Sequence, residues 1–280
     1  FTQRRLSDEA NGLHAGSPVT DAGRTSAREY LLGAVAAAAI AGLALLEPIP
    51  QDPAYHDFAD TRTHLAIPNF WNVVSNVPFI LVGAAGLLFL RKHDREGMLA
   101  ELRPAYIILF CGILLTGAGS AWYHLSPDNR TLIWDRLPMT LAFMGLFTII
   151  IGEHISQRWA RNLLLPLLVA GTLSVVYWAL SESRGTGDLR PYALVQFLPM
   201  LLIPLMLLMY PSHFDRTAFL WWVIAAYGAS KALEHYDRGI FALDGIVSGH
   251  SLKHVVAALA PLLLLYGFAT RHPARDRAQR

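Results

Sequence analysis

Residues 249–270 read GHSLKHVVAALAPLLLLYGFAT, an apolar stretch that begins with two histidines. A run of about 20 predominantly apolar residues is the length that spans the hydrocarbon core of a bilayer as an α-helix. Ionisable side chains are costly at membrane depth, so a membrane helix that carries them is read as a functional one. The stretch therefore predicts a transmembrane helix with a functional site at one end.

The two histidines, His250 and His254, are four residues apart, so a helix places both imidazoles on one face. A third histidine, His124, ends another apolar run over residues 106–123. Three histidine ligands leave one coordination position for water, which is the pattern of catalytic zinc rather than structural zinc. The residues alone leave two interpretations open: ligands of one zinc ion in an intramembrane hydrolase, or hydrogen-bonded histidines at the membrane interface.

The chain around this stretch has the composition of a membrane protein. Of its 280 residues, 54% are hydrophobic and 16% are charged, and the mean hydropathy is +0.36. Soluble domains carry about 25% charged residues. No basic run alternates with aromatic residues, so nothing in the sequence predicts nucleic-acid binding, and a single cysteine, Cys111, excludes an internal disulfide. The apolar blocks that we interpret as transmembrane helices lie at 30–47, 70–90, 104–124, 132–152, 161–180, 191–210, 217–235 and 250–270.

These blocks predict an all-α integral membrane protein. We expect a disordered polar tail over 1–29, an extra N-terminal transmembrane helix over 30–48, a membrane domain over 49–271 and a basic tail over 272–280. The first apolar block is rich in alanine and follows basic residues, so a signal peptide is an alternative interpretation of it.

The positive charges predict an orientation, because cytoplasmic loops are enriched in Lys and Arg. With a cytoplasmic N-terminus and eight spans, both termini are cytoplasmic, and most basic residues fall on that side. The opposite loops then carry only Arg62, Arg130, Arg184, Arg190 and Arg238. This topology places His124, His250 and the start of the helix containing Asp135 at the same, non-cytoplasmic face.

Ser120 and Asp135 are candidate companions of the histidines. Ser120 lies one helical turn before His124, where its hydroxyl can reach a metal ligand, a water or an oxyanion, or bond a carbonyl of its own helix. Asp135 can act as the base for a metal-bound water, as a carboxylate favoured at a helix N-terminus, or as the partner of Arg136. Gly117 and Gly119 allow another helix to approach closely.

Three blocks of sequence carry a resemblance to a known family. They are Asn69-Phe70-Trp71-Asn72-Val73-Val74-Ser75-Asn76, then Gly119-Ser120-x-x-x-His124 followed by Asp135 in Asp-x-Leu-Pro-Met, and Gly249-His250-x-x-x-His254. In this order and spacing, they resemble the alkaline ceramidases, which belong to the CREST group of membrane hydrolases with seven helices. The resemblance implies a catalytic core of seven helices, to which the first apolar block is an addition.

The resemblance also implies roles for individual residues. His124, His250 and His254 are expected to hold Zn²⁺, Asp135 to move the proton of the attacking water, and Ser120 to stabilise the oxyanion. The expected reaction is hydrolysis of the N-acyl amide of a ceramide-like membrane lipid to a fatty acid and a long-chain amine. A receptor similar to the adiponectin receptors and a proton-coupled transporter are the alternatives; the Trp-Asn-x-x-Ser-Asn block favours the ceramidases.

The chain departs from the family pattern in the acidic residues that bind calcium in the eukaryotic enzymes. Asp57 and Asp60 match them loosely, but Asn69 stands where the family has Glu, so the resemblance leaves a calcium site near Asp57 and Asp60 open. Farther along, Lys231, Glu234 and Asp237 fall on one side of a predicted helix. We interpret them as a structural ion pair, with contact to a substrate head group as the alternative.

Overall fold

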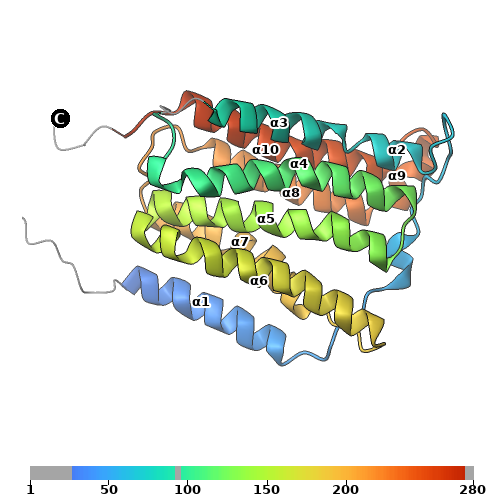
Figure 1. Cartoon of the computed structure of the whole chain (residues 1–280), viewed down its shortest axis with the longest axis horizontal. Helices are drawn as coiled ribbons and strands as arrows, with labels where there is room; N and C mark the ends of the chain where they lie inside the picture. Colours follow the sequence, from blue (N-terminus) through green and yellow to red (C-terminus); the bar gives the residue numbers. More distant parts are fainter. Residues whose placement is uncertain (1–26, 92–95, 275–280) are drawn as a thin grey trace, which may run out of the picture.

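A computed structural model describes residues 27–91 and 96–274 of the chain (Figure 1). The predicted polar tail over 1–29 therefore lies almost wholly outside the described residues, as does the greater part of the basic tail. The described chain is helical and has no β-strand. Its helices are α1 (Ala27–Ala44), α2 (Phe70–Val74), α3 (Val77–Leu90), α4 (Arg103–Leu125), α5 (Asn129–His154), α6 (Gln157–Ser183), α7 (Arg190–Met209), α8 (Phe219–His235), α9 (Asp237–Asp244) and α10 (Gly249–Thr270).

The long helices confirm the prediction of an all-α membrane protein with one helix added before a core of seven. Among the described residues, seven stretches are long and apolar enough to cross a bilayer: α1, α2 together with α3, and α4, α5, α6, α7 and α10. The 17-residue helix α8 is just too short for that group, but it packs along α10 and completes the core. The α1 helix lies outside this core, against α7, and Leu32 is its one buried residue.

Glycines set the close packing of α4 on α5. A Cβ atom on Gly119 would lie 1.9 Å from the carbonyl oxygen of Trp134, and one on Gly112 would lie 2.6 Å from the backbone nitrogen of Ala142. Neither position has room for a side chain, because the facing atoms belong to the backbone of α5. This contact fixes the helix that carries Ser120 and His124 against the helix that carries Asp135.

The apolar block at 70–90 is interrupted, which the hydrophobic pattern did not predict. The chain leaves the helix after Val74 and re-enters it at Val77, with Pro78 in the first turn of α3. Asparagine and serine side chains take over backbone hydrogen bonding at the break: Ser75 Oγ and Asn76 Nδ2 both donate to the carbonyl of Asn72. The short amphipathic helix α9 was also not predicted, and it ends at Gly245 in a left-handed conformation, φ 65°.

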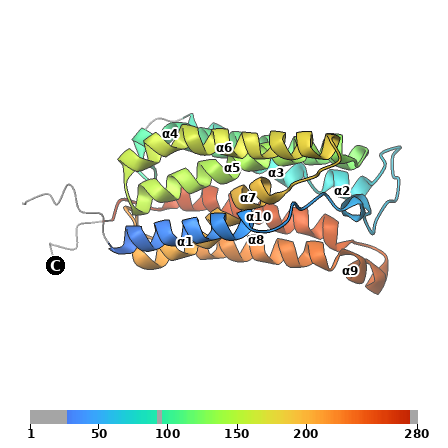
Figure 2. The same cartoon turned by 90° about the horizontal axis from the view of Figure 1, so that it is seen from below.

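The helices bring the predicted site residues to one end of the bundle. The C-terminal end of α4, the N-terminal ends of α5 and α10, and the short helices α2 and α9 all lie there (Figures 1 and 2). Both ends of the described chain lie at the opposite end. The side of the membrane that each end faces stays a prediction from the Arg and Lys distribution.

Candidate active site

The three histidines predicted as ligands meet in the structure, although they lie on α4 and α10. The Nε2 atoms of His124 and His250 are 3.3 Å apart, and one ring nitrogen of each of the three histidines lies within 4.8 Å of the others. All three side chains are buried, at 1%, 5% and 6% exposure for His124, His250 and His254. Two nitrogens bound to one tetrahedral zinc at about 2.0–2.1 Å are roughly 3.4 Å apart, so the cluster fits this ion.

The break between α2 and α3 orients His254. Ser75 Oγ lies 2.8 Å from Nδ1 of His254, which leaves Nε2 of that ring free for a ligand. A hydrogen bond to the other nitrogen is the usual means by which a protein fixes the tautomer and orientation of a metal-binding histidine. Asn72 joins the same helices, because its Oδ1 accepts a hydrogen bond from Ser251 Oγ at 2.8 Å. The Trp-Asn-x-x-Ser-Asn block thus supports the ligand helix α10.

An aromatic side chain from the segment between α1 and α2 covers the histidines. The ring of Phe58 lies 4.7 Å from that of His124 and 4.4 Å from that of His250, measured between centroids. Next to it, Tyr123 Oη lies 2.8 Å from Nδ1 of His56, and Nε2 of His56 lies 2.9 Å from Asn129 Oδ1. These contacts were not predictable from the sequence, since a phenylalanine and a histidine in a loop have no pattern that links them to distant helices.

The acidic residues considered for calcium both pair with arginines. Asp60 is bound by Arg62 at 2.7 Å, and Asp57 by Arg238. Burial favours the protonated form of Asp60, but the hydrogen bonds from Arg62 outweigh it and lower the pKa of the carboxyl. Asn69 donates to the carbonyl of His124 at 2.9 Å. These carboxylates are therefore already neutralised within the protein.

Ser120 and Asp135 lie beside the histidines on the wall of one cavity. This cavity has a volume of about 280 Å³, and His254 lines it too. The alternatives for Asp135 find little support in the described residues: Asp128 caps α5 through the backbone amides of Arg130 and Thr131, and no ion pair joins Asp135 to Arg136.

Charged side chains also line this polar cavity. Lys231 Nζ lies 2.6 Å from one oxygen of Glu234, and Lys253 binds the other oxygen. The expected ion pair is therefore present and includes a second lysine that the prediction did not contain. Asp237 stays out of it and accepts backbone hydrogen bonds from Ala59 and from His250, at 2.9 and 2.7 Å.

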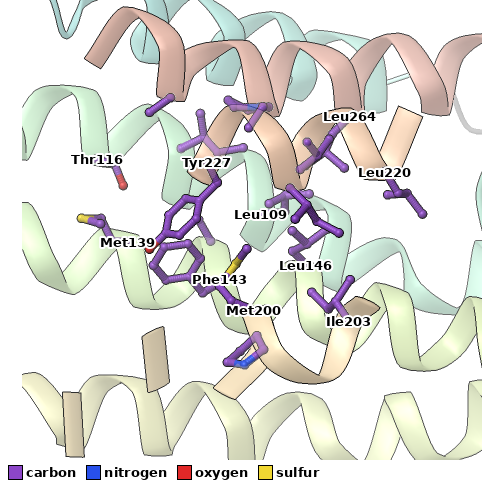
Figure 3. A pocket seen from close by; sticks show the side chains of 18 of the residues that line it. Leu109, Thr116, Met139, Phe143, Leu146, Met200, Ile203, Leu220, Tyr227 and Leu264 are labelled. Atoms are coloured by element: carbon purple, nitrogen blue, oxygen red, sulfur yellow. The ribbon is translucent and has the colours of Figure 1, made fainter. Parts of the chain in front are cut away.

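A second, apolar cavity of about 150 Å³ continues from the polar one. Among the residues that the two share are Thr116, Met139 and Tyr227, which lie at one end of the apolar cavity, while Ile203 and Leu220 lie toward the other (Figure 3). Side chains of α3, α4, α5, α7, α8 and α10 form its walls. Together the cavities fit an amphiphile whose polar part lies by the histidines and whose chain extends between the helices.

Comparison with known proteins agrees with this arrangement. Residues 61–216 match the ceramidase family, and this is more than half of the chain. No curated protein matches the chain. The matched segment contains Ser120, His124 and Asp135, and the fold joins His250 and His254 to it from beyond its end. The chain belongs to the ceramidase family, whose members are hydrolases of amide bonds in membrane lipids.

Proposed function

We propose that this protein is a zinc-dependent intramembrane amidase that hydrolyses the N-acyl amide bond of ceramide-like lipids to a fatty acid and a long-chain amine. The observation that carries the proposal is the convergence of three buried histidines beside Asp135, at the polar end of an apolar cavity. Membership in the ceramidase family supports the reaction class.

The metal would be held by His124, His250 and His254, with Ser75 orienting the last of these. A zinc ion with three histidine ligands lowers the pKa of water towards about 7 and polarises a carbonyl oxygen. The all-nitrogen donor set and its burial match this ion better than magnesium or calcium, which prefer oxygen ligands.

The chain's own acid and hydroxyl groups would move the proton and stabilise charge. Asp135 accepts a proton from the attacking water and returns it to the amide nitrogen as the C–N bond breaks, so that the amine leaves uncharged. Ser120, beside Asp135, donates a hydrogen bond to the amide oxygen as negative charge develops on it. The acyl chain lies among the apolar side chains of the second cavity.

The distribution of basic residues supports an orientation for this site. Arg91 follows α3, Arg103 begins α4, and Arg158 and Arg161 lie near the start of α6. These helix ends are at the end of the bundle opposite to the histidines (Figure 1). By the positive-inside rule, this end and both termini are cytoplasmic, and the active site faces the other side of the membrane.

Two variants test the proposal in purified full-length protein. We expect His250→Ala to lose bound zinc and to stop releasing fatty acid from ceramide, because it removes a ligand. Asp135→Asn is expected to keep zinc and to lose about 10²–10⁴-fold in turnover, because an amide cannot carry the proton. Metal content by mass spectrometry and released fatty acid are the two measurements.

The control is His235→Ala, since His235 is exposed at the end of α8 and contributes nothing to the cluster. It should retain both zinc and activity. Full hydrolysis by the His250→Ala protein would overturn the metal assignment. Loss of zinc from the Asp135→Asn protein would make Asp135 a structural residue.

A further inference from the structure

We infer that the substrate carries an acidic group on the amine side of its amide bond, and that Arg136 binds this oxyanion. The chemical class is an N-acyl lipid with a phosphate, sulfonate or carboxylate head group. This inference rests on the proposed function and narrows it, since a neutral ceramide offers only hydroxyl groups at the same place.

Arg136 is a buried cation held in a defined orientation. Its side chain is 5% exposed, and its Nη2 atom donates a hydrogen bond of 2.6 Å to Gln51 Oε1. The guanidinium carbon lies 4.2 Å from the ring centroid of Trp178 and 4.8 Å from that of Tyr192. These rings and the glutamine fix the guanidinium plane, so little conformational entropy remains to be lost when an anion binds.

Among the described residues, the guanidinium has no anionic partner. Its Nη1 atom is buried without a hydrogen bond, and none of the ion pairs formed within the described residues includes Arg136. A buried charge is costly unless it is paired, and contact with aromatic rings compensates for this only in part. An oxyanion in the cavity that accepts from the guanidinium group would supply the missing partner.

The other arginine that is buried among the described residues shows the contrast. Arg271 also stacks on aromatic rings, with its guanidinium carbon 4.1 Å from the centroid of Phe214. Its guanidinium nitrogens, however, bind both oxygens of Glu153 and the carbonyl of Gly97. The protein thus provides a carboxylate for the buried arginine that is remote from the cavity, and none for the arginine that lines it.

The surroundings of Arg136 favour an anion over a neutral group. The charged residues on the cavity wall are three cations and two carboxylates, namely Arg136, Lys231, Lys253, Asp135 and Glu234. Metal in the histidine cluster would add further positive charge. The hydroxyls of Tyr55 and Tyr192 are on the same wall, and neither forms a hydrogen bond within the described chain, so both can donate to the bound group.

The position of Arg136 assigns the acidic group to the head of the lipid. Arg136 follows Asp135 directly, whereas Met139, one turn further along α5, already belongs to the apolar cavity. Gln51 and Tyr55, which adjoin the guanidinium, come from the segment that covers this end of the bundle. The anion therefore lies toward the loops, and the hydrocarbon chains extend the other way.

The first test compares substrates on the wild-type protein. Three N-acyl lipids share one acyl chain and one amine backbone, and end in a hydroxyl, a phosphate or a carboxylate. We expect kcat/KM to be about ten- to hundred-fold higher for at least one acidic lipid than for the hydroxyl lipid, as suits a hydrogen bond to a charged group. The two acidic arms distinguish phosphate from carboxylate. Equal or faster hydrolysis of the hydroxyl lipid overturns the inference and leaves the proposed function standing.

The second test uses variants of the arginine. Arg136→Gln should abolish the preference for the acidic lipid, and Arg136→Lys should retain part of it, because lysine keeps the charge and loses the planar fork. The control is Arg130→Gln, an exposed arginine on the same helix, which should leave the preference unchanged. An unchanged preference in Arg136→Gln overturns the inference. If that variant does not fold, Arg136→Lys and Tyr192→Phe carry the comparison.

A binding measurement keeps the inference separate from hydrolysis. Dodecyl phosphate should raise the melting temperature of the wild-type protein more than dodecanol does, and the difference should disappear in Arg136→Gln. The metal-free His250→Ala protein should still show it, because the anion is held by the arginine. The opposite result is that the difference in melting temperature disappears in His250→Ala and persists in Arg136→Gln. It would assign the phosphate to the metal and overturn the inference, even if no lipid amide is hydrolysed.

Discussion

Ser75 shows how one hydroxyl outside the histidine cluster orients a member of that cluster. It is buried, and its Oγ is 2.8 Å from Nδ1 of His254. Without that bond the ring can rotate and present either nitrogen, so the ligand is no longer preorganised. Ser75 belongs to a sequence block that carried the family resemblance. In this chain, the physical role of the block is to orient α10.

We expect Ser75→Ala to weaken zinc binding by about 10–100-fold, the usual effect of removing a group that orients a metal ligand. Competition with a chelator measures this affinity, and the melting temperature of the protein checks that the fold is retained. Ser183→Ala is the control, since the Ser183 hydroxyl is exposed and bonds only a carbonyl of its own helix. Unchanged zinc affinity in Ser75→Ala would show that the bond to His254 is incidental.

At the scale of the helices, the contact of α4 with α5 brings the acid and the hydroxyl together. Gly119 lies against the carbonyl of Trp134, the residue before Asp135, and Ser120 follows Gly119 directly. A side chain at position 119 must push α5 away, and it would separate Ser120 from Asp135 as well.

Gly119→Ala is therefore predicted to destabilise the protein by about 1–3 kcal/mol, the usual cost of overpacking, and to lower its activity. Thermal unfolding in detergent and ceramide hydrolysis are the measurements. Gly228→Ala on α8 is the matched control, because a Cβ there meets nothing within 4 Å. Helix propensity predicts that this control is neutral or stabilised by up to about 1 kcal/mol. Equal stability of both variants would show that α4 and α5 can move apart without lowering the free energy of unfolding.

The connection between α6 and α7 is held by a carboxylate. Asp188 accepts two hydrogen bonds of 2.9 Å from Arg190, and Arg190 also donates to the carbonyl of Ala44 at the end of α1. The hydrogen bonds from Arg190 lower the pKa of Asp188 from its ordinary value of 3.8 to about 2. This side chain thus links α1 to the core through the charge of its carboxylate.

A depressed pKa makes this link sensitive to acid. The ionised Asp188 carboxylate stabilises the folded protein in full above the unfolded pKa of 3.8, and this stabilisation is lost as the pH falls toward about 2. Its contribution to the free energy of unfolding is on the order of 2 kcal/mol. We expect Asp188→Asn to lower the melting temperature at pH 6 and to have much less effect at pH 2. The difference between wild type and variant, measured across this range, checks the prediction. A constant difference would mean that the carboxylate charge is irrelevant.

For the molecule as a whole, a buried ion pair holds the end opposite to the histidines. Glu153 at the end of α5 and Arg271 after α10 are both 0% exposed in their side chains. Arg271 also donates to the carbonyl of Gly97, and Tyr106 donates to Glu153 at 2.8 Å. The pair thus joins α4, α5, the segment before α4 and the end of α10 around one charge.

Removing one partner of a buried pair leaves an uncompensated charge, so Arg271→Met is expected to cost about 3–5 kcal/mol in the free energy of unfolding. The double variant Glu153→Met with Arg271→Met should recover most of this loss, because no buried charge remains. Unfolding of the three proteins in one detergent tests the prediction. If the double variant is as unstable as the single one, packing and not charge explains the loss.

Much of this architecture was predictable from the sequence because the bilayer imposes a simple rule on it. Every apolar block except the one at 70–90 corresponds to a single helix. The charge pattern alone predicts that the histidine ends of α4 and α10 share one face of the membrane. The interruption at Ser75 and Asn76 was not predictable. A short polar pair within an apolar block does not reveal which distant side chains it contacts, and these contacts accompany the break. The roles of Phe58 and Arg136 were missed for the same reason.

The sequence by itself determined the helical membrane fold, the family and the three histidines, because hydropathy, charge and spacing are local properties that the chain carries in order. Only the tertiary structure decided which residues contact these histidines: Ser75 lies against His254, and the ring of Phe58 lies against that of His124. It also decided that Asp57 and Asp60 pair with arginines. It also revealed Arg136 as a buried cation without an anionic partner among the described residues. Such contacts depend on which residues from distant parts of the chain are brought within a few ångströms, and only the folded arrangement of helices and loops decides that.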